Sequence, residues 1–129
     1  AVRLGLNRAK GIGIKAARHI VEARKISPFE NTSDLASRAS LNTAEMRSLA
    51  HSDALRALSG HRRQALWAVA SHIKQLDLMQ DAPVRETLPN IAAAREGEEI
   101  TADYASTELT LRRHPLALLR PKLTRMNLH

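Results

Sequence analysis

Two glycines that flank one apolar residue, Gly11-Ile12-Gly13, have the residue types and spacing that point most directly to chemistry. Glycine lacks a Cβ, so the backbone there can turn sharply and approach another molecule closely. The segment that follows, Ile14 to Lys25, is predicted to be a helix that begins at this turn. Free amides and the positive end of the helix dipole attract anions, and Lys10 and Lys15 flank the turn. The pattern therefore predicts a shallow basic site for a nucleic-acid phosphate.

The positive charge of the chain is concentrated around this turn. The 129 residues carry a formal net charge of +7, and residues 1–28 alone hold seven basic residues and one acidic residue. Residues 59–74 add Arg62, Arg63 and Lys74 without an acidic residue. Such clustering is typical of a localised contact with a polyanion. A basic surface that only keeps the domain soluble is the alternative.

We expect the phosphate contact to use both backbone and side chains. Gly11 and Gly13 let the amides reach phosphates, and Ile12 anchors the turn in the core. Basic side chains on either side of the turn add charge, and two arginines of a later helix extend the contact. The predicted phosphate-binding residues are Lys10, Gly11, Ile12, Gly13, Lys15, Arg18, Arg62 and Arg63.

The elements that must position these residues are helical. The chain has only three aromatic residues and few β-branched runs, which argues against a sheet. Apolar residues recur at helical spacing, so we predict an all-α fold. The residues expected to face inward are Ile14, Ala17, Ile20, Val21 and Ala23, then Leu35, Ala36 and Ala39, then Met46 and Leu49, and finally Leu66, Val69, Ala70, Ile73 and Leu76 of a helix over 61–78.

The unit of two helices joined by a turn around Ile12 is repeated around Leu41, which indicates a tandem helix-hairpin-helix arrangement. In the second copy Ser40 and Asn42 replace the two glycines. Asparagine adopts the left-handed conformation at modest cost, so we expect the turn to keep its shape. Cβ atoms crowd its amides, so we expect the first copy to make the contact and the second to be its structural partner.

The chain divides into three parts by composition. Residues 1–79 are predicted to form the tandem helix-hairpin-helix DNA-binding domain. Residues 80–97 contain two prolines and no periodicity, and are predicted to be a linker. Residues 98–129 are expected to form a helical or irregular extension, in which Pro115 limits a helix. The chain begins with Ala1 and not with methionine, so we expect a piece of a longer protein or a processed one.

Patterns for metal binding and catalysis are absent from the sequence. None of the six histidines forms an H-E-x-x-H motif, there is no cysteine, and the aspartates are scattered without a D-x-D pair. Walker A and G-x-S-x-G motifs are also missing. We therefore expect no metal, no cofactor and no catalytic residue in this chain. No apolar run approaches the roughly 20 residues of a membrane span, so we expect a cytoplasmic protein with no membrane contact.

Several blocks of the sequence resemble the tandem helix-hairpin-helix region of bacterial C-family DNA polymerases, the replicative alpha-subunit family. The first blocks are residues 2–6, Lys10 to Gly13 and Ala16 to Val21. Two later blocks, residues 61–67 and 97–116, are closer to the error-prone branch of that family. That branch is associated with damage-induced translesion synthesis and mutagenesis.

This resemblance implies a function and partners for the chain. The parent protein would be a DNA-directed DNA polymerase whose catalytic aspartates lie upstream, and an OB-fold would follow this stretch. The implied partners are double-stranded DNA, other polymerase domains and mutasome accessory proteins. The residues implied to contact duplex phosphates are Lys10, Gly11, Ile12, Gly13 and Lys15.

Two other functions fit the sequence. A protein-interaction module would dock through the helix over 61–78, where Trp67 lies beside the apolar stripe. That position favours a core or interface role for Trp67 over stacking on a base. A helix-hairpin-helix nuclease subunit or repair protein is the other possibility, and the missing carboxylate cluster argues against a nuclease.

Overall fold

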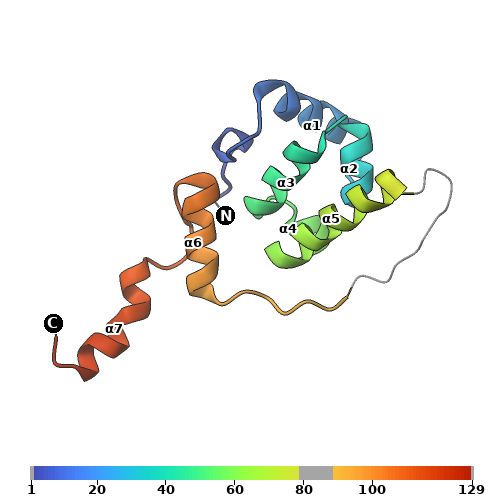
Figure 1. Ribbon diagram of the computed structural model, residues 1–129. Helices are drawn as coiled ribbons and strands as arrows, with labels where there is room; N and C mark the ends of the chain where they lie inside the picture. The colour runs from blue at the N-terminus through green and yellow to red at the C-terminus, as the bar shows by residue number, and fades with distance from the viewer. Residues whose placement is uncertain (1, 79–88, 129) are drawn as a thin grey trace.

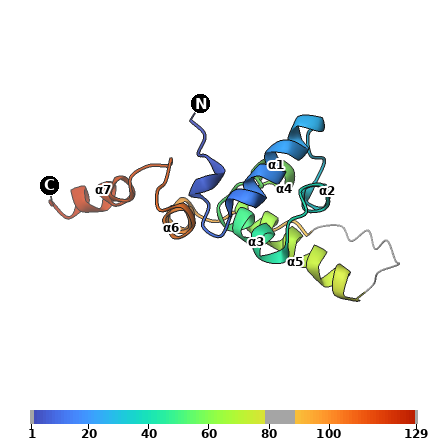
Figure 2. The same cartoon turned by 90° about the horizontal axis from the view of Figure 1, so that it is seen from above.

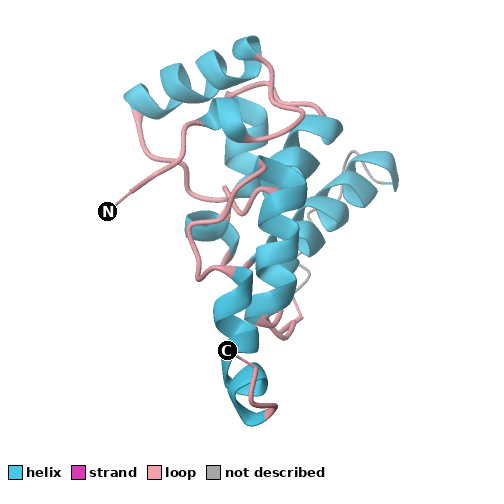
Figure 3. Cartoon of the chain, turned by 90° about the vertical axis from the view of Figure 1, so that its left-hand side faces the viewer, coloured by secondary structure: helices cyan, strands magenta, loops and turns pink. Residues whose placement is uncertain are grey.

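The computed structural model describes residues 2–78 and 89–128, and residues 73–78 through their backbone alone. All regular secondary structure in these residues is helical, without a strand (Figure 3). This confirms the predicted all-α fold. The elements in chain order are η1 (Leu6–Arg8), α1 (Ile14–Ile26), α2 (Thr32–Arg38), α3 (Thr43–His51), α4 (Arg56–Ser59), α5 (Arg62–Leu78), α6 (Glu96–Thr107) and α7 (Pro115–Arg125).

One hydrophobic core holds α1 to α5 together (Figures 1 and 2). Helix α5 packs mainly against α3 and α4. Of the predicted inward-facing residues, the core confirms Ile20, Leu35, Ala39, Met46, Leu49 and Val69. The prediction is wrong for Ala70, which is exposed, and the side chains of Ile73 and Leu76 lie outside the described part of the structure. Its larger buried side chains are Ile20, Leu35, Met46, Leu49, Leu55 and Val69.

Helix α1 packs on a face that only partly overlaps the predicted one, since Ile20 and Ala23 are buried as predicted. Ala16, Ile20 and Ala23 are buried, whereas Ile14 is 76% exposed and Val21 is 37% exposed. Alanine and isoleucine occur on two sides of this helix. The apolar pattern therefore allows either of two sides of the helix to face the core. The observed rotation places the small Ala16 inward and leaves the first residue of the helix at the surface.

A single arginine of α2 fixes the corner between α1 and α2. Arg38 donates hydrogen bonds to the carbonyl oxygens of Ala23 at 2.6 Å and Ser27 at 2.9 Å. Its guanidinium also lies over the ring of Phe29, 4.8 Å from the centroid. The last carbonyls of a helix have no partner within the helix, so Arg38 both satisfies them and orients α1 relative to α2.

The C-terminal part of the chain contains two helices that behave differently. Helix α6 packs against α3, while α7 stands apart from α1 to α5 in both views (Figures 1 and 2). Pro115 does not limit a preceding helix as predicted. It begins α7 instead, because proline lacks an amide hydrogen and suits the first position of a helix. Of the linker predicted over 80–97, residues 80–88 lie outside the described residues and residues 89–95 form no helix, whereas Glu96 and Gly97 already belong to α6.

Candidate nucleic-acid interface

The glycine turn, residues 9–13, joins η1 to α1 and places free amides at the surface. Gly13 is the N-cap of α1 and has no side chain to bond the first amides of the helix. The first helical hydrogen bond runs from Ala17 N to Gly13 O at 3.0 Å. Within the described residues, no acceptor meets the amides of Gly11, Gly13 and residues 14–15, and all four residues are exposed. Such amides are suited to an anion.

Two other amides of the glycine turn already have partners. Lys10 N donates to Ser106 O of α6 at 3.0 Å, and Ile12 N donates to Ala9 O at 3.3 Å. The half-buried Ile12 side chain packs against the core, as expected of an anchor. Lys10 and Ile12 can therefore supply a charge and an anchor, while the free donors belong to the glycines and the start of α1.

Gly11 has a conformation and a neighbour that exclude a side chain. Its φ of +89° lies in the left-handed region, where a residue with a Cβ is strained. A Cβ built on Gly11 would overlap Ser48 Oγ of α3 and lie 3.3 Å from Ser48 Cβ. Gly13 has a φ of −80°, and a Cβ built there meets nothing within 4 Å. Gly11 thus lets the turn sit against α3, and Gly13 leaves open space at the start of α1.

The three basic side chains predicted for this turn are exposed. Lys15 and Arg18 form no ion pair with any residue that the structure describes. Lys10 Nζ lies 3.4 Å from Glu108 Oε1, and both side chains are more than half exposed. An ion pair this exposed contributes less than about 1 kcal/mol, so Lys10 can exchange Glu108 for a phosphate.

The serine turn, residues 39–42, has the shape of the glycine turn but offers fewer free amides. Ser40 has a positive φ of +51°, in the same left-handed region as Gly11 at +89°. Asn42 is an N-cap with a φ of −82°, close to the −80° of the N-cap Gly13. The prediction that Asn42 takes the left-handed conformation is therefore wrong. Asn42 instead has an extended backbone and caps the N-terminus of α3. Its Oδ1 accepts a hydrogen bond from Glu45 N at 2.8 Å, and its backbone N donates one to Glu45 Oε2 at 2.9 Å.

This reciprocal capping box removes donors and adds a negative charge where an anion would otherwise bind. Leu41 N also has a partner, the carbonyl oxygen of Ala36 at 3.0 Å. The structure thus adds a second reason to expect weaker anion binding at the second copy. Besides the crowding by Cβ atoms, the Glu45 carboxylate occupies the place of the anion. The role of the second hairpin as a structural partner stays a prediction.

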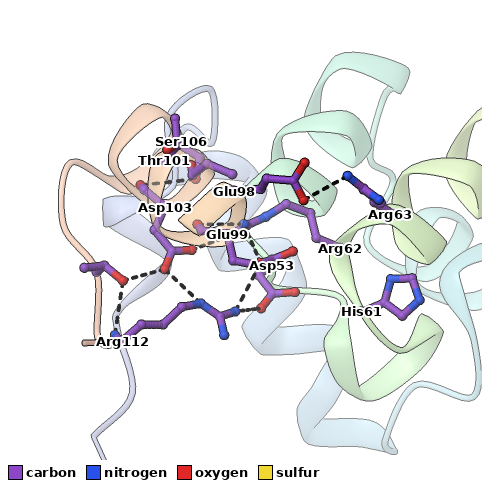
Figure 4. Close-up of polar contacts among 12 residues, drawn as sticks. Asp53, His61, Arg62, Arg63, Glu98, Glu99, Thr101, Asp103, Ser106 and Arg112 are labelled. Carbon is purple, nitrogen blue, oxygen red and sulfur yellow. Dashed lines mark hydrogen bonds and ion pairs between the residues drawn. The ribbon is translucent and has the colours of Figure 1, made fainter. Parts of the chain in front are cut away.

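Arg62 was predicted to extend the phosphate contact, and the structure contradicts this. The residue is 4% exposed. Its Nη1 donates to Glu99 Oε2 at 2.6 Å and to Glu99 O at 3.2 Å, and its Nη2 pairs with Asp103 (Figure 4). The positive charge is therefore neutralised by two carboxylates of α6 and is not accessible to DNA. In sequence, an arginine beside His61 and Arg63 gives no sign of this burial.

Arg112 completes an ion-pair network that the sequence did not reveal. It lies within 3.3 Å of carboxylate oxygens of Asp53, Glu99 and Asp103 (Figure 4). Burial raises the pKa of Asp103, but hydrogen bonds from Thr110 and Arg62 and the positive charges of Arg62 and Arg112 together hold it below its ordinary value. The network joins α6 to α5 and to the loop after α3, and so holds Ser106 against the glycine turn.

The remaining predicted residues lie on the outer face of α5. Arg63 is exposed and pairs with Glu98 at 3.2 Å. Its role in phosphate binding stays a prediction. Trp67 is 49% exposed, so it does not belong to the core. Among the side chains that the structure describes, those of residues 2–72 and 89–128, no three acidic or histidine residues gather as metal ligands do. No helix of residues 2–78 and 89–128 is long and apolar enough to cross a membrane.

Comparisons with known proteins agree with this geometry. A family model described as a helix-hairpin-helix motif matches residues 1–65, which contain both hairpins. A protein of Azoarcus sp. named error-prone DNA polymerase is 51% identical over 97% of this chain and 12% of its own length. Proteins of the same name from Bordetella parapertussis and Alkalilimnicola ehrlichii are 49% and 44% identical, over 98% and 99% of the chain. No solved structure matches it.

The relatives confirm the resemblance to error-prone polymerases over nearly the whole chain, although the chain spans only about 12% of their length. The alignments extend beyond the motif match to the later block at residues 97–116, which is where the sequence resembles the error-prone branch. The motif match covers slightly more than half of the chain and coincides with its two hairpins. The chain belongs to the helix-hairpin-helix motif family.

Proposed function

We propose that this chain binds duplex DNA through backbone phosphates, without reading the base sequence, as an accessory region of an error-prone DNA polymerase. The observation that carries the proposal is the set of exposed amides at Gly11, Gly13 and residues 14–15, which have no acceptor within the described part of the chain. Lys15 and Arg18 lie on the helix that begins at these amides. A phosphate oxygen supplies the missing acceptor and the opposite charge.

The chemistry of the site favours phosphate over a base edge. Hydrogen bonds from amides to a charged acceptor contribute about 1.5 to 3 kcal/mol each, and the dipole at the N-terminus of α1 adds to the attraction. Contacts to phosphates position a protein on DNA but carry no base information. The glycine turn itself offers backbone donors, and backbone donors are the same whatever sequence the DNA has.

The relatives suggest the setting in which this binding is used. Because they are named error-prone DNA polymerases and the chain aligns with only 12% of each, we propose that the chain holds DNA for a polymerase whose catalytic residues lie elsewhere in the protein. Translesion synthesis in the cytoplasm, with other polymerase domains and accessory proteins as partners, is part of this proposal. Binding a phosphate through amides and lysines requires no cofactor.

The salt dependence of DNA binding tests this proposal. We expect the chain to bind short duplexes of unrelated sequence with similar affinity. The logarithm of the affinity should fall linearly with the logarithm of salt concentration, with a slope of about −0.9 for each phosphate neutralised. Contacts from Lys10, Lys15 and Arg18 predict a slope of about −3, which is a loss of roughly 40-fold between about 50 mM and about 200 mM salt. Fluorescence anisotropy of labelled duplexes measures both quantities.

A chain that binds no DNA at low salt, or binds with an affinity insensitive to salt, would contradict the proposal. The second candidate would then be the stronger one. It is a protein-interaction surface on α5, and the half-exposed Trp67 favours it, because an exposed tryptophan is typical of interface anchors. Capture of a partner that is lost on Trp67→Ala would support that candidate.

A further inference from the structure

We propose that Arg47, on the exposed face of α3, makes an additional phosphate contact next to the glycine turn. This inference rests on the proposed DNA binding and adds a residue to it. Arg47 would supply a phosphate contact of the kind that was predicted for Arg62, which is buried. The contact would come from the second hairpin, whose own turn offers fewer free amides because of the capping box of Asn42 and Glu45.

The glycine turn lies directly against α3 at the residue that follows Arg47. A Cβ built on Gly11 would overlap Ser48 Oγ, so the turn and this part of α3 are in contact. Ser48 itself is half-buried there. The main chain of Arg47 is thus one residue from the contact point, and the length of an arginine side chain allows it to reach a phosphate beside the one at the turn.

Helix α3 presents Arg47 to solvent and not to the core. Met46, Leu49 and Ala50 are the buried residues of this helix, while Arg47 is exposed. His51, one helical turn further along, lies on the same side as Arg47 and is exposed as well. A strand of DNA that leaves the glycine turn across α3 can therefore meet the basic side chain of Arg47.

The Arg47 side chain also has no partner in the described part of the chain. Among the described residues it makes no hydrogen bond and no ion pair, in contrast to many other arginines of the chain. The carboxylate nearest in sequence, Glu45, is occupied by the capping box, and Asp53 pairs with Arg56 and Arg112. An unpaired guanidinium on the helix that contacts the glycine turn is suited to bind a phosphate of the same strand.

Affinity measurements on Arg47→Ala test the inference against Arg125→Ala as a matched control. Arg125 is also exposed, but it lies on α7, which stands apart from the hairpins (Figures 1 and 2). We expect Arg47→Ala to weaken duplex binding by about fivefold at low salt and to make the salt slope less steep by about 0.9, as loss of one phosphate contact requires. Arg47→Lys should keep the slope, and Arg125→Ala should behave as the unmodified chain.

Including Gly13→Val in the same series separates this inference from the proposed function. If Gly13→Val weakens binding while Arg47→Ala matches Arg125→Ala, the role of Arg47 is overturned and the glycine turn remains the DNA site. If neither Gly13→Val nor Arg47→Ala changes affinity, the proposed interface as a whole is wrong. Equal losses for Arg47→Ala and Arg125→Ala would also overturn the inference, because they would indicate general attraction by net charge.

Discussion

Replacing Arg62 with alanine should lower the free energy of unfolding by about 3 to 5 kcal/mol, because it leaves buried carboxylates without their main counter-charge. Glu99 and Asp103 would keep only Arg112, which lies at 3.1 Å from one and 3.3 Å from the other. Domains of this kind have a total stability of about 5 to 15 kcal/mol. The loss should therefore be plain in urea denaturation followed by the helical circular dichroism signal.

The neighbouring arginine provides the control for this prediction. Arg63 also pairs with a glutamate of α6, at 3.2 Å, but the side chains of Arg63 and Glu98 are 45% and 55% exposed. Exposed pairs contribute less than about 1 kcal/mol, so Arg63→Ala should change the unfolding curve little. Equal destabilisation by the two substitutions would contradict the claim that the buried ion pairs of Arg62 contribute more to stability than the exposed pair of Arg63.

The two glycines of the glycine turn should separate folding from DNA binding. Gly11→Ala is expected to destabilise the chain by about 2 to 4 kcal/mol, from the strained positive φ together with the close approach to Ser48. Gly13→Val should fold normally, because its φ of −80° suits any residue and its Cβ has open space. Its side chain, however, obstructs the free amides, so DNA affinity should fall by at least about tenfold, which is the lower limit for the loss of one amide-to-phosphate hydrogen bond.

Paired measurements of unfolding and of duplex affinity check both substitutions. Ser48→Ala in the Gly11→Ala background should recover part of the stability, since it removes the hydroxyl that the new Cβ overlaps. A Gly13→Val chain that is stable and still binds DNA with full affinity would show that the amides at the start of α1 are not the phosphate site.

Local features of the structure were predictable from the sequence. Helices with clear caps and apolar periodicity, such as α3 with buried Met46 and Leu49, lie where the pattern placed them. The glycine turn was predictable because positive φ and close packing both favour glycine. The serine turn shows where prediction from residue type fails. Residue type favoured the left-handed conformation at Asn42, but Ser40 adopts it.

The ion-pair network was not predictable, because its partners are distant in sequence. Arg62 meets Glu99 and Asp103 across 37 and 41 residues, and no local spacing rule connects positions so far apart. A basic residue next to His61 and Arg63 therefore looked like part of a DNA-binding surface. The partner of the Lys10 amide was equally unpredictable, because this amide donates a hydrogen bond to the carbonyl oxygen of Ser106 in the distant α6. Contacts between distant segments decide which cations and amides remain free.

A titration of the ¹⁵N-labelled chain with a short DNA duplex, followed by the backbone amide resonances, tests the phosphate site most directly. We predict the largest shifts at the amides of Gly11, Gly13, Ile14 and Lys15, which are free in the structure. The amides of Leu41 and Asn42, which are already paired, should shift little. Shifts centred on the serine turn or around Trp67 of α5, with the glycine turn unaffected, would contradict binding through the first hairpin.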